Sequence, residues 1–162
     1  MDFAPENQDE VRALRQQHIG RLLQQAYRAY NHRAIAKLRE RGHTGLTLAH
    51  TLLLSNLDLE GTRITVLAER VGITKQSMGQ LVEDLEKRGY VERQVDATDR
   101  RASVVRFTPA GWRFLQDAYE LKQEIEAEYQ AILGAAEFDQ LRATLRQLLA
   151  HTAVRGDEEP GE

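Results

Sequence analysis

The 162-residue sequence predicts a mainly α-helical fold that contains one small β-hairpin and has long helices at both ends. Three observations lead to this prediction. Apolar residues recur at helical spacing over most of the chain, glycines divide it into segments of helix length, and two short β-prone runs flank a polar tip. Shorter elements therefore occupy the centre of the chain.

The composition is typical of a soluble globular protein, with 41% hydrophobic and 29% charged residues. No apolar run reaches the length of a membrane span, and the polar start does not resemble a signal peptide, so a cytoplasmic protein without a membrane partner is expected. The absence of cysteine excludes disulfides and Cys-based zinc sites. Bases gather within residues 11–41 and acids from Asp117 onward, so the net charge of −3 says little about any local patch.

At the N-terminal end, apolar residues at helical spacing predict one long helix over residues 9–40. Gly42 and Gly45 follow it and are expected to end it. Thr47 is suited to N-cap a second helix that reaches about Leu57. The first helix is much the longer of the two.

A short strand at Ile64-Thr65 is expected to precede two helices, residues 66–71 and 75–88. Gly72 suits the left-handed turn between them, and Thr74 suits the N-cap of the second helix. The apolar residues expected at the helix crossing are Leu67, Val71, Ile73, Met78 and Leu81. This pattern predicts a helix-turn-helix, and a helical hairpin that merely packs is the alternative interpretation.

A β-hairpin is expected next, with strands at Tyr90–Val95 and Val104–Phe107. A strand before the helix pair and a hairpin after it define a winged helix-turn-helix, in which the hairpin tip is the wing. The tip carries four charged residues, Asp96, Asp99, Arg100 and Arg101. Arginines of a wing can reach the minor groove of a duplex, and a neighbouring carboxylate can hold one of them in a single pose. A solvated charged loop is the alternative interpretation.

The second helix of the pair, the recognition helix, exposes short and amide side chains in its N-terminal half. Such a helix can lie in the major groove, where Gln bonds adenine and Lys or Ser reaches bases or phosphates. The predicted DNA-binding residues are Thr74, Lys75, Gln76, Ser77 and Gln80 in the recognition helix and Asp99, Arg100 and Arg101 in the wing.

After the hairpin, Thr108 and Pro109 are expected to open a helix that ends near Gly134, where a last helix follows. The apolar residues along these two helices are Leu121, Ile125, Ile132, Phe138, Leu141, Leu145, Leu148 and Leu149. No single-domain core is large enough to cover them, so a homodimer is expected, and a monomer with folded-back helices is the alternative. The expected organisation is an N-terminal dimerisation helix, a winged helix-turn-helix and C-terminal dimerisation helices, at residues 1–45, 46–111 and 112–162.

From about Leu46 to Gly111 the sequence resembles the MarR family of bacterial winged-helix regulators. The stretch that carries the resemblance is ITVLAERVGITKQSMGQLVEDLEKRGYVERQVDATDRRASVVRFTPAG. Ala97 stands where the family often has proline. The family's wing and post-wing motifs fall on Asp96, Asp99 and Arg101, and on Phe107, Thr108 and Gly111.

The resemblance implies an obligate homodimer in which the first helix and the last two interlock. Such a dimer would bind a pseudo-palindromic operator with half-sites about one helical turn apart. A transcriptional repressor is the expected form, and a small aromatic ligand between the dimer helices and the winged helix is the effector that the family implies. Candidate residues of that crevice are His18, Arg21, Tyr27, Tyr30 and His50. The alternative interpretation is that the tyrosines belong to the hydrophobic core.

No pattern typical of an enzyme is found, because the five histidines are scattered and no HExxH, Gly-rich phosphate loop or nucleophile elbow is present. His43, His50 and a carboxylate are the candidate metal ligands. Surface or interhelix histidines are the preferred interpretation, so no metal or cofactor is expected. A winged helix used for protein contact, as in an antirepressor, is the alternative function, and the arginine wing argues against it.

Overall fold

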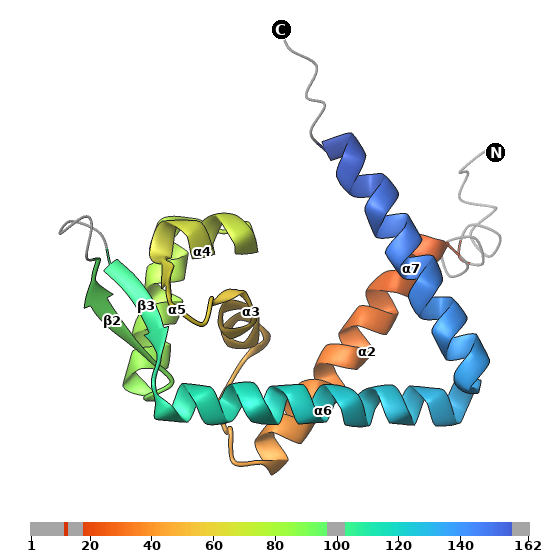
Figure 1. Ribbon diagram of the computed structural model, residues 1–162, viewed down its shortest axis with the longest axis horizontal. Coiled ribbons are helices and arrows are strands. Elements are labelled where there is room, and N and C mark those ends of the chain that lie inside the picture. Colours follow the sequence, from red (N-terminus) through yellow and green to blue (C-terminus); the bar gives the residue numbers. More distant parts are fainter. Residues whose placement is uncertain (1–11, 13–17, 97–102, 157–162) are drawn as a thin grey trace, which may run out of the picture. The chain divides into compact units, whose positions relative to one another are not determined.

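The computed structural model describes Arg12, residues 18–96 and residues 103–156, which form a mainly helical fold with a small antiparallel sheet (Figure 1). This confirms the expected fold class. The chain divides into two compact units, Met1–Leu121 and Lys122–Glu162. The elements are α2 (Ile19–Glu40), α3 (Leu48–Asn56), β1 (Thr62–Arg63), α4 (Ile64–Val71), α5 (Lys75–Lys87), β2 (Val91–Val95), β3 (Ser103–Phe107), α6 (Pro109–Leu133) and α7 (Ala135–Gly156).

The first strand lies earlier in the chain than the sequence indicated. The prediction placed it at Ile64-Thr65, whereas β1 is Thr62–Arg63 and Ile64 already begins α4. The expected start of that helix at residue 66 was wrong for the same reason. A strand is fixed by its partner as well as by β-branched residues, and β1 pairs with β3 through Val105 and Val104. Of the expected helix over residues 9–40, the structure describes Arg12 as helical and then α2 from Ile19.

The core of the winged helix lies where α3, α4 and α5 pack together with the sheet, whose strand order is β1-β3-β2. Burying one large apolar side chain contributes roughly 1.5–3 kcal/mol, so these contacts hold α4 and α5 in a fixed relation. The side chains without measurable exposure in this region include Leu53, Leu67, Met78, Val82, Leu85 and Val105. Of the apolar residues expected at the helix crossing, Leu67 and Met78 are buried, and Val71, Ile73 and Leu81 are half-buried.

The predicted starts of α3, α5 and α6 are each confirmed by a cap, whereas α4 has no side-chain cap. The Thr47 side chain accepts a hydrogen bond from the His50 amide, and the Thr74 side chain accepts one from the Ser77 amide. Pro109 is the first residue of α6, and Thr108 Oγ1 accepts a hydrogen bond from the Gly111 amide at 3.1 Å. These local bonds set where each helix begins.

The start of α6 is tied to the end of the recognition helix through backbone contacts. The Thr108 amide donates to the Tyr90 carbonyl at 3.1 Å, and the Thr108 hydroxyl donates to the Gly89 carbonyl. Gly111 is buried one turn into α6, against Tyr90 and Phe107. The first turn of α6 therefore packs directly on the segment that leads into β2.

In the second unit, the last part of α6 and α7 are joined by polar contacts of Arg142. Its guanidinium lies 2.9 Å from Glu126 Oε2 and 4.9 Å from the ring centroid of the buried Phe138. Several large apolar side chains of α6 and α7 remain exposed instead. They include Ile132, Leu133, Leu141, Leu148 and Leu149.

Candidate nucleic-acid interface

The turn between α4 and α5 has the geometry of a helix-turn-helix. Gly72 adopts a φ of 73°, in the left-handed region that favours glycine. Its amide donates to the Glu69 carbonyl, and the Ile73 amide donates to the Ala68 carbonyl. Ala68 is buried at the crossing, where its small side chain lets the two helices approach.

The N-terminal half of α5 carries the predicted DNA-binding residues on its exposed surface. The Thr74 hydroxyl accepts the Ser77 amide at 3.1 Å and lies 2.9 Å from the Ser77 hydroxyl. These two side chains therefore fix the start of the helix. The five predicted residues, all exposed, are Thr74, Lys75, Gln76, Ser77 and Gln80.

In the C-terminal half of α5, charged side chains are paired along the helix. Glu83 lies 2.7 Å from Lys87, and Asp84 lies 3.1 Å from Arg88. The hydrogen bond from Lys87 lowers the pKa of Glu83, so that carboxyl stays ionised at neutral pH. The charged groups in this half neutralise one another, in contrast to the amide and hydroxyl groups of the N-terminal half.

An arginine of β2 lies against the backbone of α5. Arg93 Nη2 donates to the Gly79 carbonyl at 3.1 Å, and Arg93 Nε lies 2.9 Å from Glu86 Oε2. The other oxygen of Glu86 accepts the Arg93 backbone amide at 2.9 Å. The sequence analysis missed this contact because Arg93 and Glu86 lie on different elements, and no local pattern links them.

The base of the wing is held by an ion pair that the sequence analysis also missed. Arg63 Nε lies 2.6 Å from Asp96 Oδ2, and Asp96 is buried. The sequence placed Asp96 among the charged residues of the wing tip, whereas the structure shows it joined to β1. The predicted wing residues Asp99, Arg100 and Arg101 lie outside the residues that the structure describes.

His50 lies beneath the recognition helix and completes the cap of α3. Its Nδ1 accepts the Thr47 amide at 3.1 Å, and its Nε2 lies 3.0 Å from Asp84 on α5. Imidazole here occupies the position that Glu or Gln fills in the usual capping box. Burial lowers the pKa of His50, against the opposing effect of the Asp84 charge.

Acidification from pH 7 to 5.5 is expected to destabilise the fold through His50. Its pKa is lower in the folded protein than in the unfolded chain, so the unfolded chain binds the proton more readily. The contribution of neutral His50 is complete above about pH 6.5 and falls below it, by at most about 1.4 kcal/mol per pH unit. A protonated Nδ1 could no longer accept the Thr47 amide. Urea unfolding at the two pH values measures the effect.

The variant His50→Gln is expected to keep the cap, because a Gln side chain can accept the same amide, and to reduce this pH dependence. His18→Gln is the matched control, since His18 is exposed and makes no side-chain cap bond. An equal pH dependence in wild type and His50→Gln would contradict the assignment.

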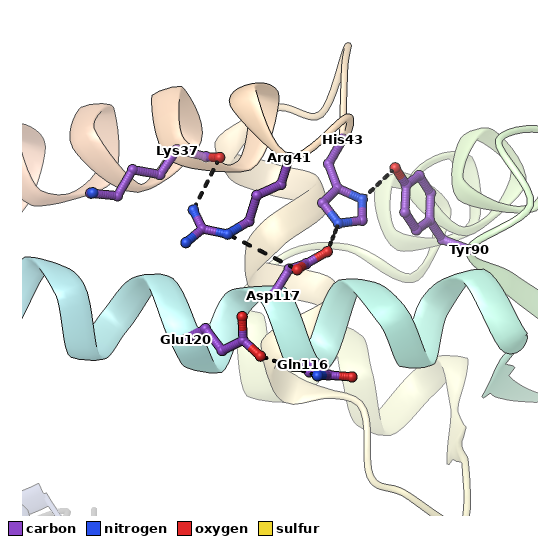
Figure 2. Close-up of polar contacts among 7 residues, drawn as sticks. All are labelled: Lys37, Arg41, His43, Tyr90, Gln116, Asp117 and Glu120. Carbon is purple, nitrogen blue, oxygen red and sulfur yellow. Dashed lines mark hydrogen bonds and ion pairs between the residues drawn. The ribbon is translucent and has the colours of Figure 1, made fainter.

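A second histidine links the end of α2 to α6 and to the winged helix, as Figure 2 shows. His43 Nδ1 lies 3.0 Å from the Tyr90 hydroxyl, and His43 Nε2 lies 2.8 Å from Asp117 Oδ2. Arg41 Nε lies 4.0 Å from the other oxygen of Asp117. Burial raises the pKa of Tyr90, so its hydroxyl stays protonated at neutral pH. The side chain of His43 thus joins three parts of the first unit.

The structure places the predicted crevice residues in different surroundings. His18 and Arg21 line one shallow surface hollow, together with Gly20 and Gln24. Tyr27 is exposed and Tyr30 is half-buried further along α2, while His50 is buried in α3. The crevice therefore stays a prediction. Within the described residues, no group of three His, Asp or Glu side chains could hold a metal ion.

The paired helices, the left-handed Gly72 and the three-stranded sheet define the chain as a winged helix-turn-helix protein. Among the described residues, no helix combines the length and the apolar character needed to cross a membrane.

Comparison with known proteins extends this class to a family. The model of the MarR family matches residues 44–102. Transcriptional repressor MprA of Escherichia coli (strain K12) is 29% identical over 80 residues, which are 49% of this chain and 46% of MprA. The chain thus spans about half the length of that relative.

Two solved structures show the same fold. Wild-type MarR from E. coli in its apo form has a TM-score of 0.70 at 20% identity, covering 82% of this chain and 96% of that chain. The PcaV transcriptional regulator from Streptomyces coelicolor, solved with its natural ligand, has a TM-score of 0.62 at 22% identity, covering 87% and 95%. Residues 44–102 thus match the MarR family, and the fold is that of MarR proteins.

Proposed function

We propose that the chain is a transcriptional regulator that binds double-stranded DNA sequence-specifically as a homodimer. The observation that carries the proposal is the exposed N-terminal half of α5, held on a well-packed winged helix of the MarR family. In this proposal residues 46–111 bind DNA, and residues 1–45 and 112–162 form the dimer.

In the proposed complex α5 lies in the major groove. Gln76 and Gln80 are one turn apart and are proposed to read base edges, while Lys75 and the free amides at the helix start favour phosphates. Arg100 and Arg101 are proposed to reach the adjacent minor groove, with Asp99 orienting Arg101. The ion pair between Arg63 and Asp96 supports this placement, because it fixes the strand from which the wing starts.

The proposed dimer is supported by apolar surface on both terminal helices. A stable interface needs a continuous apolar surface, and isolated exposed leucines would not supply one. On α2 the exposed residues are Ile19, Leu22, Leu23 and Tyr27, and on α7 they are Leu141, Leu148 and Leu149. We propose that a second copy of the chain covers these residues.

A repressor that a small ligand releases is the finer form of the proposal. The similarity to MprA, which is named a transcriptional repressor, supports repression. The similarity of fold to PcaV, solved with its natural ligand, supports a small-molecule effector. We propose that this effector is aromatic and binds near α2, with His18, Arg21, Tyr27, Tyr30 and His50 as the candidate residues.

Fluorescence anisotropy with a labelled duplex of random sequence, at 50 and 200 mM salt, tests the proposed function. A regulator that neutralises DNA phosphates should bind at low salt and lose roughly a thousandfold or more in affinity over this range. An antirepressor that contacts protein alone, or an enzyme with another substrate, should show no such salt-dependent binding. Selection of bound fragments then supplies the specific duplex.

Replacement of Gln76 or Gln80 by alanine is expected to cost about 1–3 kcal/mol of discrimination at specific base pairs. Each variant should lose preference at its own position, because the two side chains lie one turn apart on the helix. Anisotropy competition with single-base variants of the selected duplex measures this. The matched control is Gln140→Ala on α7, which should leave sequence preference unchanged. Unchanged preference in the double variant would exclude α5 as the reader.

A further inference from the structure

Gly79 occupies the middle of the N-terminal half of α5, where a glycine is unfavourable. In a helix interior glycine costs about 1 kcal/mol relative to alanine, because it loses more conformational freedom on folding. Gly79 is not among the glycines with a positive φ, so an alanine could adopt its backbone conformation. A conformational requirement therefore does not account for this glycine.

Packing inside the protein does not account for it either. A Cβ built on Gly79 meets no atom within 4 Å in the structure. Gly61 and Gly111 differ, because a Cβ on either would collide with neighbouring backbone or side-chain atoms. Of the residues that the structure describes, none needs the space that Gly79 leaves open.

The surroundings of this open space are polar and include a guanidinium that is held in place and paired with a carboxylate. Lys75, Gln76 and Gln80 are exposed on the same half of the helix. The Arg93 guanidinium is held beside the Gly79 backbone by the Gly79 carbonyl and by Glu86. Because Glu86 and the carbonyl fix this guanidinium, little side-chain entropy remains to be lost when it binds an anion.

We propose that Gly79 is where the recognition helix approaches the DNA backbone most closely, and that a phosphate lies over its Cα beside Arg93. The proposal rests on the proposed function, since it concerns the same DNA. A glycine is required wherever a backbone must come very near a ligand, and a Cβ here would push the helix out of the groove. The energetic cost of glycine in the free protein is then offset in the complex.

The substitution Gly79→Ala should have opposite effects on the stability of the free protein and on its affinity for DNA. The free protein should unfold at a higher temperature, because alanine is the better helix former and meets no obstacle. Affinity for the selected duplex should fall roughly tenfold or more, and the slope of log affinity against log salt should fall by about one, as for one lost phosphate contact. Thermal unfolding and anisotropy titrations between 50 and 200 mM salt measure both.

Gly20→Ala on α2 is the matched control. Gly20 has no positive φ, and its added Cβ would meet only His18 Nδ1 at an ordinary 3.6 Å. This variant should also gain stability, which shows how much of the gain in Gly79→Ala comes from helix formation alone.

Three results of these experiments would lead to different conclusions. Unchanged affinity of Gly79→Ala in a protein that binds DNA normally would overturn the proposal for Gly79 alone. A lower unfolding temperature would also overturn it, since the glycine would then serve the fold. No salt-dependent binding by the wild type would instead overturn the proposed function, on which the proposal for Gly79 depends.

Discussion

Replacing Gly111 with alanine is expected to destabilise the winged helix by about 3 kcal/mol, which corresponds to a fall of about 10 °C in unfolding temperature. An added Cβ would overlap the Tyr90 carbonyl oxygen and lie 2.9 Å from Phe107 Cδ1. The hydrogen bond from the Thr108 amide to the same Tyr90 carbonyl holds the two segments together, so neither can move apart without a further loss. Thermal and urea unfolding followed by circular dichroism measure the effect.

The same chemical change at Gly79, where the added Cβ meets nothing, is the control and should not lower stability. A Gly111→Ala variant as stable as the wild type would show that the first turn of α6 can move away from Tyr90. The described packing would then not be what fixes α6 on the winged helix.

Truncation after Gly134 removes α7 and is expected to convert the proposed dimer into a monomer. The deleted helix carries the exposed Leu141, Leu148 and Leu149, and without them too little apolar surface remains for a stable interface. Affinity for a two-half-site duplex should fall by on the order of 10²–10⁴, because the second half-site no longer gains from the first. Light scattering gives the mass, and anisotropy gives the affinity.

Point variants keep this test decisive if the truncated chain does not fold. The pair Leu141→Glu and Leu148→Glu places two charges in the proposed interface, whereas Gln140→Glu and Gln147→Glu add the same charges at exposed polar positions. Only the leucine pair should lower the mass and abolish the dependence of unfolding on protein concentration, which a dimer shows and a monomer does not. A monomeric wild type with full affinity for the duplex would contradict the dimer.

The features that the sequence predicted correctly are set by neighbouring residues. Thr47, Thr74 and Gly72 act through hydrogen bonds to residues three or four positions away, or through their own φ, so their roles are visible in a short window. The helical spacing of the buried residues Met78, Val82 and Leu85 on α5 can also be recognised within a short stretch of sequence. This is why the helix-turn-helix and most helix ends could be predicted.

The contacts that could not be predicted from the sequence join different helices and strands. Arg63 and Asp96 are 33 positions apart, and His43 and Asp117 are 74 apart. No spacing rule connects such residues, because their contact depends on how the elements pack. The strand error has the same origin, since the pairing with Val104 and Val105 places β1 at Thr62–Arg63. Gly79 is another such case, because only the structure shows that the space above it is open.

The contact between Glu86 and the Arg93 backbone amide lies at an edge of the sheet. β2 is an edge strand, and unpaired amides on an edge strand can template the addition of a strand from another molecule. Glu86 already accepts the Arg93 amide at 2.9 Å, and three of the exposed β2 residues, Glu92, Arg93 and Gln94, are polar, while Val95 is exposed and apolar. At the opposite edge of the sheet, the two residues of β1 pair with Val105 and Val104 of β3. One carboxylate of α5 thus both orients an arginine and occupies a backbone amide that a strand added at this edge would need.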